Sequence, residues 1–176
     1  DEWGYFSQWF AFGSNPVNAE GWQAMGGNHF ETTSILQFFI YLSREEVYLL
    51  RLGADLPLGQ WCHMAMVSGP GGMRLYLNGV LVGQNGYEGS FAAIGTGANN
   101  YLGQSQWDGN AYFRGQLDEV RVWSVARSGA EIGAGMKAPL RGDEQGLVGL
   151  WNFDAADAAD SSPQNHHGQM HGGART

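Results

Sequence analysis

Two acidic side chains, Asp118 and Glu119, stand next to each other in the chain. Paired carboxyls could serve glycoside hydrolysis, because a retaining enzyme holds two of them about 5 to 5.5 Å apart around one bond. Consecutive residues of a strand point to opposite faces, so a strand over residues 118–123 would separate these two groups. The positions two residues further on, Val120 and Arg121, are not acidic. The spacing therefore predicts a chain that is not an enzyme.

Each of these acids has a simpler role open to it. Asp118 follows Gly115 at the expected start of a strand. There its carboxylate either accepts backbone N–H bonds and pins a turn, or serves as a calcium ligand. Glu119 is expected to be a solvated partner of a neighbouring arginine, an arrangement that contributes little to stability.

A polar loop over residues 104–112 offers a second chemistry, metal binding. Gln106, Asp108 and Asn110 place oxygen-bearing side chains at alternate positions. Calcium is bound by several carboxylate, amide and carbonyl oxygens. The sequence therefore predicts a calcium site with Asp108, Asn110 and Asp118 as candidate ligands; the alternative is a polar loop without metal.

The same loop carries aromatic side chains that could contact a ligand. Trp107 has no apolar neighbours in sequence, and a tryptophan can stack on a sugar ring while its N–H donates a hydrogen bond. The alternative is that Trp107 folds back on the core. Tyr112 and Trp22 are further candidates, Trp22 because residues 18–30 read as a loop. Gln106 and Asn110 would supply hydrogen bonds to the same ligand.

Composition excludes several other functions. The net charge is −8 and Lys137 is the one lysine, so no basic surface is available for nucleic acid or anionic membranes. No apolar run approaches a membrane span. Cys62 is the single cysteine, which rules out an internal disulfide and indicates an inert buried thiol. His166, His167 and His171 are expected in a turn rather than in a metal site.

Alternating apolar and polar residues dominate the chain and predict strands. Asn78-Gly79 between two alternating runs predicts a type I′ hairpin, because both central residues need positive φ. The run 34–42 is apolar on both faces and reads as a central strand rather than half a helix. A short helix is expected over residues 127–136, with Ser128 and Glu131 forming a capping box. The remaining predicted strands are 4–12, 46–53, 61–67, 100–104, 118–123 and 146–153.

These strands, turns and single short helix predict an all-β sandwich. They also contain an ordered series of motifs that resembles the laminin-G-like domains of the concanavalin A-like lectin/glucanase superfamily, which includes the pentraxins. The series is W-x-H-x-A-x-V at 61–67, R-L-Y-L-N-G at 74–79, Y-L-G at 101–103, F-x-G-x-L-D-E-V-R-V-W at 113–123, A-R-S-x-x-E-I at 126–132, G-L-V-G-L-W-N-F-D at 146–154 and D-S-S-P-x-N-x-H-G at 160–168.

The resemblance implies an antiparallel two-sheet jelly roll, and extracellular recognition of glycans or protein surfaces, often with calcium. Pentraxins carry an acidic loop after L-G-Q; here Ser105 stands where an acid is expected and Asp108 is displaced by one residue. The last motif pair is expected to close the same domain, with its strand beside residues 4–12. The prediction is one domain over residues 1–168, followed by a polar tail over 169–176.

The function expected on these grounds is non-catalytic recognition. A carbohydrate or glycoprotein would bind through edge loops, with calcium assisting, inside a larger exported bacterial protein that is extracellular, cell-surface or periplasmic. The alternative is a structural or adhesive module that contacts protein surfaces or neighbouring domains and binds no sugar. A wet, aromatic-rimmed groove would favour the first, and an exposed apolar patch would favour the second.

Overall fold

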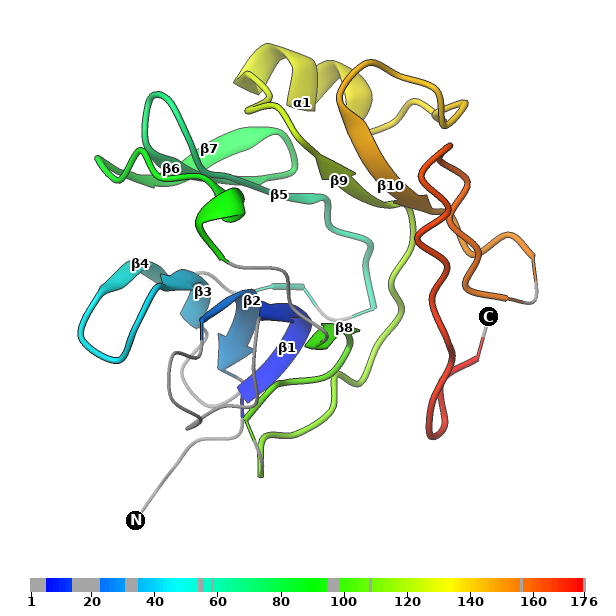
Figure 1. Ribbon diagram of the computed structural model, residues 1–176, viewed down its shortest axis with the longest axis horizontal. Coiled ribbons are helices and arrows are strands. Elements are labelled where there is room, and N and C mark those ends of the chain that lie inside the picture. Colours follow the sequence, from blue (N-terminus) through cyan, green and yellow to red (C-terminus); the bar gives the residue numbers. More distant parts are fainter. Residues whose placement is uncertain are drawn as a thin grey trace. The chain divides into compact units, whose positions relative to one another are not determined.

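The computed structural model describes residues 6–13, 23–30, 35–53, 56–57, 59–94, 99–107, 109–155 and 157–175. The chain divides into two compact units, residues 1–115 and residues 116–176, and Figure 1 shows the elements of each. The units are described separately below. The expected single domain over residues 1–168 stays a prediction.

The first unit contains a five-stranded antiparallel sheet with the order β4-β3-β2-β1-β8. The third strand along the chain is the apolar run that the sequence predicts as a central strand, and it pairs on both sides. Leu36, Phe38 and Ile40 on one face of it are fully buried. The strands are β1 (Phe6–Gly13), β2 (Ala24–Phe30), β3 (Ile35–Tyr41), β4 (Val47–Gly53) and β8 (Asn99–Leu102).

A second antiparallel sheet in this unit has the order β5-β6-β7 and confirms the three consecutive strands expected from the sequence. Its strands are β5 (Met64–Val67), β6 (Met73–Leu77) and β7 (Val80–Asn85). The hairpin between β6 and β7 turns at Asn78 (φ 50°) and Gly79 (φ 80°), as the type I′ prediction requires. A short 3-10 helix, Phe91–Ala93, follows β7.

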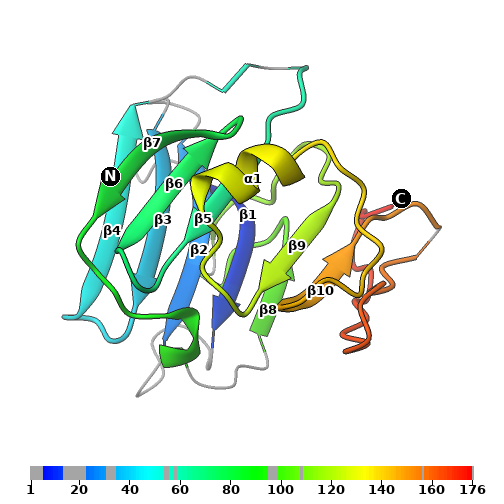
Figure 2. The ribbon, with the colours of Figure 1, turned by 90° about the horizontal axis from the view of Figure 1, so that it is seen from above.

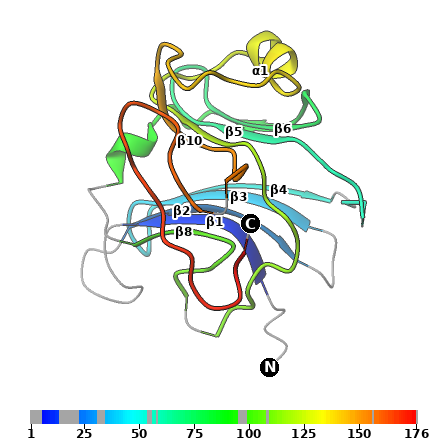
Figure 3. The same cartoon turned by 90° about the vertical axis from the view of Figure 1, so that its right-hand side faces the viewer.

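The two sheets of the first unit lie face to face, as Figure 3 shows. A Cβ on Gly27 of β2 would overlap the side chain of Met66 in β5. A Cβ on Gly83 of β7 would lie 2.8 Å from Leu52 Cδ1 in β4. The apolar core therefore sits between the sheets, and the glycines allow their backbones to approach closely.

The second unit contains a two-stranded antiparallel sheet, β9 (Val120–Trp123) with β10 (Leu147–Trp151), and one helix, α1 (Gly129–Gly135). The expected capping box is present: Ser128 Oγ accepts from Glu131 N, and the Glu131 carboxylate accepts from Ser128 N. The two reciprocal bonds satisfy backbone N–H groups at the N-terminus of the helix. They stabilise a helix that its glycines would otherwise make weak. No helix of the described residues is long and apolar enough to cross a membrane.

A buried carboxylate holds the segment that follows β10. Asp160 Oδ1 accepts from Leu150 N and Ser162 N, and Oδ2 accepts from Ser162 Oγ and His166 N, each at 2.8 Å. His167 Nδ1 accepts from Asp160 N at 3.1 Å. The D-S-S-P motif and its histidines thus form the turn that the sequence predicts.

Several expectations about element positions are wrong. Residues 18–30 were expected to be a loop, but β2 occupies Ala24–Phe30. The strand expected over 61–67 begins at Met64, and Cys62 is half-buried rather than buried.

The strand expected over 118–123 also starts later, at Val120, because Glu119 adopts a left-handed conformation with φ 51°. The late strand β10 was expected beside residues 4–12, but it pairs with β9. β1 pairs with β2 along one edge, and its residues 10–13 pair with β8 along the other.

Candidate functional site

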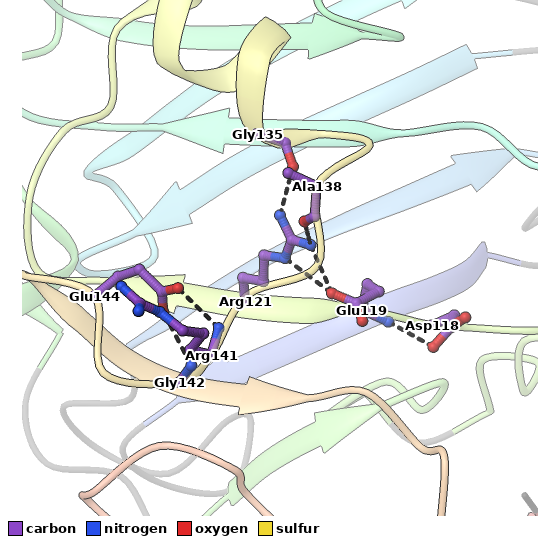
Figure 4. Close-up of polar contacts among 8 residues, drawn as sticks. All are labelled: Asp118, Glu119, Arg121, Gly135, Ala138, Arg141, Gly142 and Glu144. Atoms are coloured by element: carbon purple, nitrogen blue, oxygen red, sulfur yellow. Dashed lines mark hydrogen bonds and ion pairs between the residues drawn. The ribbon is translucent and has the colours of Figure 1, made fainter.

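The adjacent acids at the start of β9 form a structural contact. Asp118 Oδ1 accepts from Glu119 N at 2.8 Å, which supports the positive φ at residue 119. Both side chains are exposed. The Glu119 carboxylate pairs with Arg121 at 2.6 Å, as expected for an arginine partner. Figure 4 shows these side chains.

Arg121 also holds the end of the helix. Its Nη1 donates to Gly135 O and its Nη2 to Ala138 O, each at 2.8 Å (Figure 4). Carbonyls at a helix C-terminus lack partners within the helix, and a cationic donor there is favourable. The charged group on β9 therefore fastens α1 to the strand.

A second carboxylate in this region organises a turn. Glu144 accepts from Arg141 N at 2.8 Å and from Gly142 N at 3.0 Å (Figure 4). The bond from the Arg141 backbone is the main reason that the pKa of Glu144 lies below its ordinary value. Like the carboxylate of Asp118, that of Glu144 accepts backbone N–H bonds and so stabilises a local turn.

The loop over residues 103–112 is attached to the five-stranded sheet of the first unit. Gly103 N donates to Trp9 O at 2.8 Å, and Phe113 N donates to Gly103 O at 2.9 Å. Ser105 is buried, and its Oγ accepts from Trp107 N at 3.0 Å and from Asn110 Nδ2 at 2.8 Å. The serine that stands where an acid was expected is therefore the hydrogen-bonding centre of the loop.

Trp107 lies on the face of the five-stranded sheet that points away from β5-β6-β7; we call this the outer face. Its ring meets Phe39 edge-on, with centroids 5.6 Å apart, and Tyr41 at 5.9 Å. Phe39 is buried, whereas Tyr41 and Trp107 are half-buried. Of the two alternatives for Trp107, folding back onto the protein describes this structure, although part of the ring stays accessible.

Gln106 lies beside Trp107 on the same outer face. Its Nε2 donates to Asn99 O at 2.6 Å, while its Oε1 is buried and has no hydrogen-bond partner. The amide lies directly over Gly13 of β1, where a Cβ would overlap it. The structure thus brings two predicted residues, Gln106 and Trp107, together with an acceptor oxygen that is not used.

Three further amides form a row on the outer face. Gln8 of β1 is the cross-strand partner of Asn28 of β2, and Asn28 is the partner of Gln37 of β3. Their exposed fractions are 1%, 2% and 4%. The side-chain oxygen of each has no hydrogen-bond partner, although buried polar groups are normally bonded. We call these three residues the amide row.

The amide row is not among the site residues predicted from the sequence. A signal was present, because Gln8 and Gln37 are polar residues inside otherwise apolar strands. Their alignment depends on strand register, including a bulge in β1 between Gln8 and Phe10. On the same sheet, Gln37 lies two residues from Phe39, so the amide row borders the aromatic cluster of Phe39, Tyr41 and Trp107.

The other candidate residues are dispersed. Tyr112 is 68% exposed, and Asn110 is tied to Ser105. Trp22 and Asp108 lie outside the described residues. Asp118 belongs to the second unit. An aromatic residue that the sequence analysis placed in a strand, Trp61, precedes β5 instead and is 66% exposed.

The metal-ligand types among the described residues bear on the calcium prediction. No group of three or more histidine, cysteine, aspartate or glutamate side chains gathers among these residues. Calcium needs six to eight oxygens, usually including carboxylates. In the loop itself, Gln106 offers an unused oxygen, and the acid Asp108 is not among the described positions. Calcium binding stays a prediction.

Comparison with known proteins gives a family and a fold. A laminin-G profile described as the concanavalin A-like lectin/glucanases superfamily matches residues 4–133. No curated protein matches the chain significantly. A crystal structure from Bacteroides ovatus ATCC 8483, named a "putative carbohydrate binding protein", superposes with a TM-score of 0.59 at 20% identity. The match covers 89% of this chain and 48% of that one, so this chain spans about half its length.

A second structure, an S-layer domain-containing protein from Clostridium thermocellum ATCC 27405, matches at 22% identity with a TM-score of 0.41, covering 76% of this chain and 64% of that chain. At 20% identity, the Bacteroides ovatus match bears on the fold alone. The profile and the antiparallel sheets together establish the jelly-roll fold that the sequence predicts.

Proposed function

Because this chain belongs to the concanavalin A-like lectin/glucanases superfamily, we propose that it is a non-catalytic module that binds a carbohydrate. The site we propose is the outer face of the five-stranded sheet, around Trp107. The observation that carries the proposal is the half-buried Trp107, which stands beside the unpartnered acceptor oxygen of Gln106 and near the amide row.

The chemistry of this face suits a neutral ligand rich in hydroxyl groups. Sugar rings pack their C–H faces against aromatic side chains, and Trp107 and Tyr41 both keep accessible ring surface. The unpartnered amide oxygens are buried in this structure, so ligand hydroxyl groups would bond them only once the residues that cover them move aside; each such bond would relieve an acceptor that costs about 1–3 kcal/mol when left unsatisfied. A ligand that supplies both contacts would bind with orientation as well as affinity.

The same face supports binding without catalysis. Its described strand positions carry amides, aromatics, aliphatic residues such as Val47 and Leu49, small residues and Arg51, and none is acidic. A retaining or inverting glycosidase needs two carboxyl groups that flank one bond. The acids that suggested hydrolysis, Asp118 and Glu119, are engaged in a turn and an ion pair.

The setting that we propose is a larger exported bacterial protein, in which this module recognises an extracellular glycan. The Bacteroides ovatus structure supports a longer chain, because the match covers 48% of it. Calcium assistance is a separate proposal: Asp108 and Asn110 would hold the ion in the loop, with Gln106 as the neighbour that has an unused oxygen.

The test is a glycan array followed by titration calorimetry on the best ligand. Trp107→Ala is expected to raise the Kd about tenfold or more, since about 1.4 kcal/mol of lost aromatic contact is tenfold. Gln106→Met keeps roughly the size of the side chain but removes both its oxygen and the Nε2 donor to Asn99 O, and is expected to weaken binding; circular dichroism checks that the variant stays folded. Trp61→Ala, at an exposed tryptophan away from the loop, is the matched control and is expected to bind normally.

Two outcomes would contradict the proposal. If no glycan binds with or without calcium, carbohydrate recognition is wrong. If Trp61→Ala or Tyr112→Ala abolishes binding while Trp107→Ala does not, the ligand binds elsewhere, at an exposed aromatic side chain. Far-ultraviolet circular dichroism of each variant separates a lost contact from a lost fold.

The second candidate function, an adhesive or structural module, is favoured by a different observation. Val80, Leu81 and Val82 are three consecutive exposed apolar residues on a strand at a sheet edge. Exposed apolar patches on soluble proteins mark interaction surfaces.

A further inference from the structure

Strand β7 is an open edge. It pairs with β6, and among the described residues no strand pairs with its other side. An open edge presents unpaired backbone N–H and C=O groups, which another strand can satisfy. Figure 2 shows β7 and β4, the edge strand of the other sheet, on the same side of the first unit.

The exposed part of this edge is apolar. The exposed fractions of Val80, Leu81 and Val82 are 64%, 43% and 36%. A regular strand would alternate buried and exposed side chains. Here the register with β6 shifts between Leu75 and Tyr76, which makes Val82 an extra residue in β7 and breaks the alternation. Three successive apolar side chains therefore face solvent.

The other half of β7 is already in use. Gly83 packs against Leu52 of β4, and Asn85 Nδ2 donates to Leu49 O at 3.4 Å. These contacts occupy the C-terminal half of the strand and fix it over β4. The exposed apolar surface of β7 is thus limited to residues 80–82, at the end of the strand next to the Asn78-Gly79 turn, and the exposed residue beyond it is the polar Gln84.

We infer that residues 80–82 are a homodimer contact, in which a second copy of this chain pairs its own β7 antiparallel about Leu81. This pairing is self-complementary: Leu81 meets its own copy on the two-fold axis, and Val80 meets Val82. Residues 80–85 carry no charge in a chain of net charge −8, so two copies can approach here without opposing charged side chains of β7. The partner strand supplies the missing hydrogen bonds and covers the apolar side chains.

The position of Leu81 on the axis allows a charge-swap test. Leu81→Lys places two ammonium groups against each other in the dimer, and Leu81→Asp places two carboxylates there. Each variant alone is expected to weaken dimerisation about 100-fold or more. An equimolar mixture of the two is expected to restore a dimer, because the mixed pair sets opposite charges at the axis.

Analytical ultracentrifugation over a wide concentration range measures this directly. Wild type is expected to show a concentration-dependent species of twice the mass of the chain. Tyr112→Lys, at a comparably exposed aromatic residue outside β7, is the control and is expected to dimerise like wild type. The inference is overturned if wild type stays monomeric throughout, if Leu81→Lys still dimerises like wild type, or if the Lys and Asp variants remain monomeric when mixed. Restored dimer in the mixture also shows that both variants are folded.

Discussion

Replacing Asp160 tests how the second unit holds the segment after β10. The carboxylate is 4% exposed and accepts four hydrogen bonds, from Leu150 N, Ser162 N, Ser162 Oγ and His166 N. In Asp160→Asn an NH2 group faces two of these donors and cannot accept from His166 N. Hydrogen bonds to charged groups contribute about 1.5–3 kcal/mol each, so we expect a loss of about 2–3 kcal/mol.

The assay is thermal unfolding, with tryptophan fluorescence as the readout. At about 2–4 °C per kcal/mol for a chain of this size, the midpoint of Asp160→Asn is expected to fall by roughly 4–12 °C at pH 7. Asp157→Asn is the matched control, because Asp157 is exposed and accepts one bond, from Ala159 N. The control is expected to change the free energy of unfolding by no more than about 0.5 kcal/mol, and its midpoint should shift correspondingly little.

The pH dependence gives an independent check. Burial raises the pKa of Asp160, but the hydrogen bonds from Leu150, Ser162 and His166 outweigh burial and leave the pKa below its ordinary value. The ionised group therefore stabilises the folded state above about pH 4, and this contribution is lost as the pH falls through the lowered pKa. Equal midpoints for wild type and Asp160→Asn at pH 7, or a difference that does not shrink in acid, would refute the reasoning.

Arg121→Met removes donors to the carbonyls at the end of α1, and is expected to cost about 1–3 kcal/mol and to speed amide exchange in that helix; unchanged exchange would contradict it. Gly72→Ala is expected to cost about 2 kcal/mol or more in urea unfolding, because the Cβ would overlap Asn85 O at φ +90°. Gly71→Ala, with a similar φ but only ordinary van der Waals contacts to the Arg74 side chain, is expected to cost clearly less. Calcium at about 100 times its Kd is expected to stabilise by about 2.7 kcal/mol, or roughly 5–10 °C, relative to EDTA, and Asp108→Ala is expected to abolish the shift; no shift in wild type would sink the calcium proposal.

Local signals explain which elements could be predicted from the sequence. The Asn78-Gly79 turn, the Ser128–Glu131 capping box and the central strand β3 each depend on residues that are neighbours in the chain. β2 could not be identified in this way, because its sequence AMGGNHF has weak strand propensity. Its glycines fit tertiary crowding: a Cβ on Gly26 would lie 2.6 Å from Phe39 Cζ and 2.8 Å from Phe10 O.

The residues of the candidate site also differ in whether they could be predicted from the sequence. The loop with Gln106 and Trp107 was found because its polar and aromatic residues are contiguous. The amide row was missed because Gln8, Asn28 and Gln37 are far apart in sequence and meet through the register of three strands. Predicting the amide row from the sequence would require knowledge of the bulge in β1, and no local sequence pattern indicates that bulge.

The amide row has a cost in stability that does not depend on any ligand. Three buried oxygens without donors leave the unliganded sheet less stable than an apolar face of the same shape would be, by about 1–3 kcal/mol for each oxygen. Apolar replacements at Gln8, Asn28 or Gln37 would therefore favour a more heat-resistant protein. If the proposed ligand displaces the residues that cover the amide row, its hydroxyl groups would bond these oxygens, and the stability lost in the unliganded sheet would be recovered on binding.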